Sequence, residues 1–259
     1  MAETNDNRRI EAVILAAGKG TRMEGDLPKV LHRVADRPMA RWVIDACREA
    51  GAERLVVVVG YEAAMVRDEL AGEPDVEFVE QTEQLGTGHA VMMAEPAFNG
   101  RASCDLLVVA GDMPLFRAAT LESLVEAHRE AGAAATVATG VLDEPGGYGR
   151  IIRDEAGDFE RIVEHKDADD AQRAIREVNI SCYCFDSVKL FDALRAVTTN
   201  NVQGEYYVTD VLGILRERGE TVVATNSAGA DEVEGINTTD QLARVDGILR
   251  QRLTHEAGR

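Results

Sequence analysis

Positive charge is scarce in this sequence. Asp and Glu together number 46 against 28 Lys and Arg, which gives a formal net charge of −18. Binding to nucleic acid or to an anionic membrane surface needs clustered Lys and Arg, so the composition argues against both kinds of partner. Small anionic substrates remain compatible with it, because screening removes most of the effect of surface charges beyond about 8–10 Å. The only lysines are Lys19, Lys29, Lys166 and Lys189.

Cysteine is also scarce, and its spacing excludes the common metal and redox motifs. The four cysteines form no C-x-x-C pair and have no histidine partner at zinc spacing. Cys182 and Cys184 lie in an apolar run that reads as a strand, where both would face the same side. We therefore expect buried, structural thiols.

Long apolar runs are missing as well. No stretch approaches the run of about 20 apolar residues that a membrane-spanning helix needs. The opening segment, Met1–Arg9, is polar and carries acidic residues, so it lacks the basic-then-apolar layout of a secretory signal. We expect a cytoplasmic protein. Apolar residues still make up 45% of the chain, enough for the core of one large α/β domain or two small ones.

A regular alternation of short apolar runs and longer amphipathic segments fills the first half of the chain. This alternation predicts buried strands joined by helices, and hence a mostly parallel sheet with helices on both faces. Ligands of such sheets bind at the carboxyl ends of the strands. The predicted strands are Glu11–Ala16, Leu55–Val59, Val76–Glu80 and Asp105–Ala110, and the predicted helices are Met39–Ala50, Tyr61–Leu70, His89–Ala94 and Ala118–Ala131.

The pattern changes near residue 135, where strands in hairpin arrangement precede the last helices. We interpret residues 1–259 as a single domain with a nucleotide-binding half (about 8–135), an α+β half (about 136–237) and a C-terminal helix (238–259). The predicted strands of the second half are Ala134–Val141, Gly149–Arg153, Phe159–Val163, Val178–Phe185 and Thr221–Thr225, and the predicted helices are Val188–Ala196, Tyr206–Glu217 and Thr238–Leu253.

The first predicted strand ends in a glycine-rich loop with two cations close behind it. The loop reads Leu15-Ala-Ala-Gly-Lys-Gly-Thr-Arg-Met23, and Leu27-Pro-Lys29 follows. Small residues let backbone amides approach a phosphate closely, while Arg22 and Lys29 add fixed positive charge. Such a loop can hold a triphosphate and stabilise a pyrophosphate leaving group. The dinucleotide fingerprint and the Walker A motif both fail here, since the third glycine of GxGxxG would fall at Met23 and no Gly-Lys-Ser/Thr follows at the required spacing.

A second motif, Leu107-Val-Val-Ala-Gly-Asp-Met-Pro-Leu115, places a carboxylate at the end of the fourth predicted strand. Because the carboxyl ends of parallel strands share one edge, Asp112 should face the glycine-rich loop. Mg²⁺ prefers oxygen ligands and usually takes only one or two carboxylates from a protein. We therefore interpret Asp112 as a magnesium ligand rather than as the cap of the following turn.

These motifs belong to a longer series of matches. Over essentially its whole length the sequence resembles the uridyltransferase domain of bacterial N-acetylglucosamine-1-phosphate uridyltransferases. The resemblance implies a Rossmann-like (GT-A-like) nucleotidyltransferase fold. It also implies transfer of a uridylyl group from UTP to N-acetylglucosamine-1-phosphate, giving UDP-N-acetylglucosamine and pyrophosphate. The matching blocks are Val13–Met23, Asp26–His32, Glu83–Ala90, Gly147–Ile151, Ile162–Asp167, Gln203–Tyr207 with Thr209-Asp210, and Val233–Asn237.

The resemblance assigns catalytic and metal-binding roles. Arg22 and Lys29 would stabilise the transition state, and Asp112 with Asn237 would bind Mg²⁺. No general base is needed, because a sugar phosphate is already an anion and its attack requires positioning and charge neutralisation. We accordingly interpret the histidines within these blocks, His89 and His165, as structural.

It also assigns substrate contacts. The first half of the chain would hold UTP, with a glutamine and the start of a helix selecting uracil, and the α+β half would bind the sugar. The nucleotide-binding residues would be Leu15, Ala16, Ala17, Gly18, Gln81, Gly86, Thr87 and Gly111, and the sugar-binding residues Gly149, Glu164, Asn179 and Tyr207.

Two short segments depart from the family pattern. Ala110 stands where the family often has an aromatic or polar residue, and Ile180-Ser181 stands where it usually has Thr-Gly. Both segments lie where the sugar would be recognised. Another sugar-1-phosphate, such as that of glucose or galactosamine, or dTTP in place of UTP, therefore remains an alternative. A non-catalytic sensor of sugar nucleotides is a second alternative, which the retained cations and metal ligands disfavour.

The chain also ends at Arg259, without the hexapeptide-repeat acetyltransferase domain of the bifunctional family members. We therefore expect no acetyltransferase activity from this sequence. Any homo-oligomer would form without that repeat domain.

Overall fold

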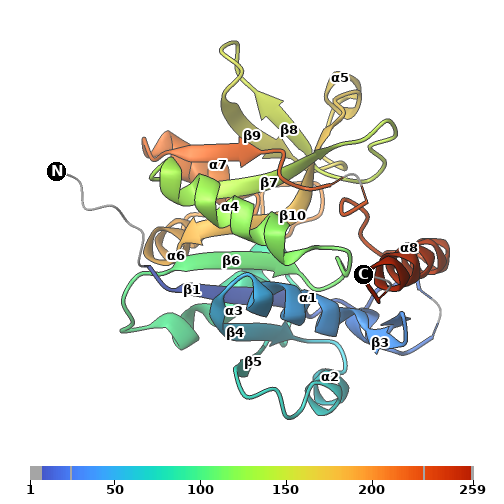
Figure 1. Ribbon diagram of the computed structural model, residues 1–259. Coiled ribbons are helices and arrows are strands. Elements are labelled where there is room, and N and C mark those ends of the chain that lie inside the picture. Colours follow the sequence, from blue (N-terminus) through green and yellow to red (C-terminus); the bar gives the residue numbers. More distant parts are fainter. Residues whose placement is uncertain (1–7, 24, 230, 258–259) are drawn as a thin grey trace.

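The computed structural model describes residues 8–23, 25–229 and 231–257. Most of the polar segment Met1–Arg9, on which the prediction of a cytoplasmic protein rests, lies outside these ranges. A central sheet carries helices packed around it (Figure 1). Among the helices of the described residues, none combines the length and the apolar character needed to cross a membrane.

One sheet runs through both halves of the chain. Its main path has the strand order β11-β7-β10-β6-β1-β4-β5, and β8 and β9 form a hairpin that pairs with β10. All strands of the main path are parallel except β10, which lies antiparallel between β6 and β7. The predicted mostly parallel sheet is thus confirmed. The strands are β1 Ile10–Ala16, β4 Ala52–Val59, β5 Val76–Glu80, β6 Asp105–Ala110, β7 Ala135–Val141, β8 Arg150–Arg153, β9 Phe159–Val163, β10 Glu177–Asp186 and β11 Val222–Thr225.

Helices cover both faces of the sheet, because its strands are apolar on both sides. In β1, Ile14 faces one buried core layer and Val13 faces the other. The first layer is covered by α1 (Met39–Glu49), α4 (Ala118–Glu130) and α8 (Thr239–Ala257). The second layer is covered by α3 (Thr87–Phe98), α6 (Ser187–Leu194) and α7 (Asp210–Glu217).

Several short elements connect this framework and were missing from the sequence-based prediction. They are the 3-10 turn η1 (Lys29–Leu31), the two-stranded ribbon of β2 (Arg33–Val34) and β3 (Arg37–Pro38), and α5 (Asp170–Arg173). The remaining helix of the described residues, α2 (Ala63–Glu69), begins two residues later than predicted.

The start of α7 was also predicted wrongly, and its position affects the site. The helix begins at Asp210 rather than Tyr206. The four preceding residues instead run alongside the beginning of α3: Gly88 N donates to Tyr206 O at 2.7 Å, and Val208 N donates to the Thr87 hydroxyl at 3.1 Å. Because these backbone groups bond to α3, they are not available for an earlier helical turn.

All four cysteines are buried, as expected. Cys182 and Cys184 both belong to the first core layer, which confirms that they share a face of β10. Burial raises the pKa of all four thiols, so they stay in the unreactive protonated form.

Candidate active site

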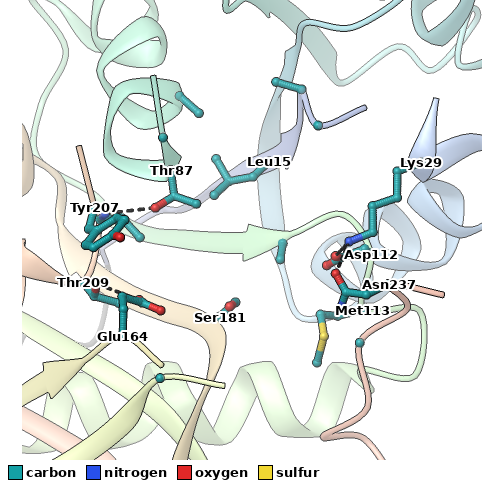
Figure 2. A pocket seen from close by; sticks show the side chains of 18 of the residues that line it. Leu15, Lys29, Thr87, Asp112, Met113, Glu164, Ser181, Tyr207, Thr209 and Asn237 are labelled. Carbon is teal, nitrogen blue, oxygen red and sulfur yellow. Dashed lines mark hydrogen bonds and ion pairs between the residues drawn. The ribbon is translucent and has the colours of Figure 1, made fainter. Parts of the chain in front are cut away.

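A cavity of about 570 Å³ opens at the carboxyl edge of the parallel strands. The registers of β1 with its neighbours pair Ala16 with Val59 and Leu15 with Ala110, and β5 ends opposite the end of β4. The loops that follow these strands therefore start at the same edge. Figure 2 shows Lys29, Asp112 and Asn237 on one side of this pocket and Glu164, Tyr207 and Thr209 on the other.

The glycine-rich loop is held close to the ends of β4 and η1. Tyr61 N donates to Ala17 O at 3.0 Å, and a Cβ at Gly60 would lie only 2.8 Å from the Ala17 Cβ. Gly20 has φ +71°, and a Cβ there would meet the Lys29 Cβ at 2.9 Å. Only a residue without a side chain fits between the loop and the lysine stem. The loop and Lys29 are therefore packed as one unit.

One end of the cavity is cationic and contains both predicted metal ligands. The Lys29 ammonium forms an ion pair with the Asp112 carboxylate and donates to Asn237 Oδ1 at 2.8 Å. Arg22 Nη2 donates to the same amide oxygen at 2.9 Å. A carboxylate oxygen and an amide oxygen thus converge on a single cation, here an ammonium. These are the hard oxygen donors that Mg²⁺ prefers.

The segment that carries Asn237 is fixed from two directions. Ile236 N donates to Asp112 O at 3.1 Å, which joins the two predicted metal ligands through the backbone. The Tyr148 hydroxyl donates to Val233 O and accepts from Gly235 N, both at 3.1 Å. Tyr148 thereby connects this segment to the Gly147–Gly149 loop at the other end of the cavity.

The predicted base-binding residues meet where β5 ends and α3 begins. Gln81 is 3% exposed, and its Nε2 donates to Gly86 O at 3.0 Å. Gly86 has φ +108°, and a Cβ there would come within 2.5 Å of Tyr206 O. Glycine is therefore required at this position for both backbone conformation and space.

The opposite end contains a partly buried carboxylate. Glu164 Oε1 accepts from the Thr209 hydroxyl at 3.0 Å, and a Cβ at Gly149 would lie 3.4 Å from the other carboxylate oxygen. Desolvation raises the pKa of Glu164, and the Thr209 hydrogen bond only partly opposes that rise. A partly desolvated carboxylate with free acceptor capacity is suited to bind ligand hydroxyl groups.

Asn179 and Tyr207 lie beside Glu164 with their polar groups already ordered. Asn179 Nδ2 donates to the Tyr183 hydroxyl at 2.7 Å, and its Oδ1 accepts from Ser181 N at 3.0 Å. The Tyr207 hydroxyl accepts from Gln203 Nε2 at 2.8 Å, and burial raises its pKa to about 12. Both side chains are thus held rigidly at the wall of the pocket.

Comparison with known proteins places the chain in a family. Residues 12–200 match the MobA-like NTP transferase domain. The chain belongs to this family. The match covers most of the sheet and the glycine-rich loop, and it confirms the resemblance drawn from the sequence motifs.

Individual relatives share about half of their aligned residues with this NTP transferase. The chain is 48% identical over 248 residues to the bifunctional protein GlmU of Syntrophomonas wolfei, covering 96% of the chain and 55% of the relative. It is 50% identical over 242 residues to the bifunctional protein GlmU of Heliobacterium modesticaldum, covering 93% of the chain and 52% of the relative. The chain thus spans about half the length of these curated relatives.

Solved structures support the fold of this NTP transferase. A UDP-glucose pyrophosphorylase complexed with UDP-glucose superposes with a TM-score of 0.75 at 18% identity, covering 94% of this chain and 99% of that one. The apo form of a UDP-glucose pyrophosphorylase superposes with a TM-score of 0.76 at 16% identity, with the same coverage. At such low identity the likeness establishes a shared fold and nothing more. It confirms the predicted Rossmann-like nucleotidyltransferase architecture.

In this NTP transferase the cavity brings together all the predicted site residues except Ala16 and Gly111. Ala16 is 1% exposed at the end of β1, and Gly111 N donates to Leu15 O at 2.9 Å. Both therefore support the wall of the cavity from behind. That they bind the nucleotide stays a prediction.

Sequence reasoning assigned no specific role to several residues that line the cavity, among them Met113, Tyr148 and Thr209. Thr209 and Tyr148 lie inside blocks that match the family, and that position could have identified them as candidate site residues. Ser181 has φ +57°, a backbone conformation that residues other than glycine rarely adopt. The sequence already marked Ser181, because it stands where the family usually has glycine.

Proposed function

We propose that this protein transfers a uridylyl group from UTP to N-acetylglucosamine-1-phosphate, producing UDP-N-acetylglucosamine and pyrophosphate. The observation that carries the proposal is a single cavity with Arg22 and Lys29 at one end, Gln81 at the base-binding end and the Glu164–Thr209 pair near the Gly149 loop. Relatives named as bifunctional GlmU proteins, near 50% identical over this length, support it.

The reaction follows from this layout. UTP lies across the glycine-rich loop with its base toward Gln81 and its phosphates toward Lys29. A phosphate oxygen of the sugar phosphate forms a bond to the α-phosphorus, and the bond from the α-phosphorus to the bridging oxygen of the β-phosphate breaks. That oxygen leaves with the bonding electron pair as part of pyrophosphate, close to Arg22 and Lys29. No proton moves, so the protein supplies positioning and positive charge.

Mg²⁺ is the cofactor we propose, held by Asp112 and Asn237. The convergence of their oxygens on the Lys29 ammonium supports the proposal, because the pair already surrounds a positive charge. The ion would neutralise charge on the triphosphate. Lys29 would then release Asp112 and turn toward the phosphates.

The test is pyrophosphate release with UTP and Mg²⁺, comparing the 1-phosphates of N-acetylglucosamine, glucose and glucosamine. We expect a clear preference for the N-acetylated sugar. Preference for glucose-1-phosphate, or for dTTP over UTP, would keep the reaction type and replace the substrate. Ala110 and Ser181 line the cavity, so they are the side chains to exchange in that event. Tight binding of UDP-sugar with no turnover of any pair would favour a sensor protein.

A further inference from the structure

The amide of Gln81 can adopt only one orientation in the site. Its Nε2 lies 3.0 Å from Gly86 O and 3.1 Å from His89 Nδ1. A carbonyl oxygen can only accept, so the group facing Gly86 O must be the NH₂ of the amide. The opposite orientation would place two oxygens 3.0 Å apart with no proton between them.

This orientation also determines the protonation state of His89. Because the same NH₂ group faces Nδ1, that ring nitrogen must accept a hydrogen bond. The imidazole is therefore neutral, with its proton on Nε2. Both hydrogens of the Gln81 amide are then used within the protein, and Oε1 is left as the group that Gln81 offers to the cavity it lines.

We propose that His89 is the positioning residue for base selection, fixing Gln81 Oε1 as an acceptor toward the base. The inference rests on the proposed function and concerns the nucleotide end of the same site. Gly86 and Thr87 are the N-cap and first residue of α3, so their N–H groups have no partner within the helix. An acceptor beside N–H donors complements the imide edge of uracil, which offers N3–H between two carbonyl oxygens. Cytosine presents an amino group and an unprotonated N3 there, so it would meet like groups.

The fold holds these three partners rigidly. Gln81 directly follows β5, and Gly86 and His89 lie three residues apart across the first turn of α3. The His89 ring lies 6.2 Å from the Tyr206 ring, centroid to centroid, on the segment that bonds to the start of α3. His89 thus has an aromatic neighbour besides Gln81.

The test compares His89→Asn with His89→Leu, two side chains of the same shape. Asn carries an acceptor oxygen at the place of Nδ1, whereas Leu carries a methyl group. We expect the ratio of kcat/KM for UTP to that for CTP to stay near wild type in His89→Asn. In His89→Leu it should fall about tenfold, because one of the two acceptors that hold the amide NH₂ is lost and only Gly86 O still opposes the flipped orientation. KM for the sugar phosphate should not change. This ratio does not depend on the fraction of enzyme that is folded.

A measurement on the wild-type protein completes the test. The ¹⁵N chemical shifts of the His89 ring, assigned by comparison with His89→Asn, should show an unprotonated Nδ1 and a protonated Nε2. A protonated Nδ1, or an unchanged UTP-to-CTP ratio in His89→Leu, overturns the inference. If wild type releases no pyrophosphate from UTP, the proposed function fails, and the ring tautomer still reports separately on the His89–Gln81 contact.

Discussion

Lys29 is the residue on which most of the cationic end of the site depends. It contacts both predicted metal ligands, and its stem packs against Gly20 of the phosphate loop. In the proposed reaction, replacing it by Ala removes a positive charge aimed at the leaving group. We expect Lys29→Ala to lower kcat by about two to three orders of magnitude, as loss of one preorganised transition-state contact typically does.

The matched control is Lys189→Ala, which removes another partly exposed lysine from an ion pair, that with Glu220, outside the cavity. Its activity should equal wild type. Near-normal turnover of Lys29→Ala in a steady-state pyrophosphate assay would remove Lys29 from the catalytic role.

Glu164, a proposed sugar-binding residue, shows the energetic consequence of desolvating a carboxylate. Its pKa is raised by desolvation, so ionising it in the folded protein costs more free energy than ionising it in the unfolded chain. That destabilisation is present at neutral pH, shrinks as the pH falls through the raised pKa and vanishes below the ordinary glutamate pKa of about 4.3.

Glu164→Gln keeps an acceptor for the Thr209 hydroxyl and removes the charge. We expect its urea midpoint to exceed that of wild type at pH 7.5 and to approach the wild-type value near pH 4. Glu122→Gln, exposed on α4, serves as the control. A difference that persists unchanged at low pH would contradict the desolvation argument.

At the scale of elements, the segment bearing Asn237 depends on the start of α4. Glu232 is 2% exposed and accepts from Arg117 N at 2.9 Å, the Thr120 hydroxyl at 2.7 Å and Gly229 N at 3.2 Å. A carboxylate at a helix N-terminus satisfies free N–H groups and interacts favourably with the helix dipole. Glu232 therefore stabilises both the start of α4 and the segment that carries Asn237.

Glu232→Gln retains the shape and loses the charge and part of the acceptor capacity. We expect a loss of about 1–3 kcal/mol in the free energy of unfolding, measured by urea denaturation. A higher Mg²⁺ concentration should also be needed for half-maximal activity. Glu234→Gln, which removes a neighbouring surface partner of Arg244, should change the stability by less than about 1 kcal/mol. Equal effects of the two substitutions would argue against the anchoring role.

The elements themselves were largely predictable, because apolar periodicity reports burial directly. The strands that carry the site were located to within a few residues, as were α1, α4 and α8. The contacts that shape the site were not predictable from periodicity. Tyr148 reaches Val233 across 85 residues, and Arg22 reaches Asn237 across 215, and no local pattern encodes such pairs. Motifs identified the participants, whereas only the fold revealed their partners.

At the scale of the whole molecule, β10 decides how the two halves behave. It hydrogen-bonds to β6 of the first half of the chain along one side and to β7 of the second half along the other. Figure 1 shows these strands in the middle of the sheet. The two halves of the chain are therefore joined by continuous strand pairing rather than by a linker. This arrangement favours the single domain that we proposed from the sequence.

A single domain predicts one cooperative unfolding transition. The only tryptophan, Trp42, lies in α1 in the first half of the chain, so its fluorescence reports on that half, whereas far-UV circular dichroism reports on all helices and strands. We expect the two urea transitions to coincide. Separate midpoints would mean that the halves unfold independently, and the single-domain assignment would then be wrong.

The buried thiols have a practical consequence for following this protein at work. Burial raises the pKa of Cys47 to about 12 and that of Cys104 to about 11, and Cys182 and Cys184 are shielded by the sheet. A maleimide dye should therefore not react with the folded protein until a new, exposed cysteine is introduced. Val202 is 72% exposed, next to the cavity-lining Gln203. A fluorophore attached there would signal substrate entry in real time, with every native cysteine left in place.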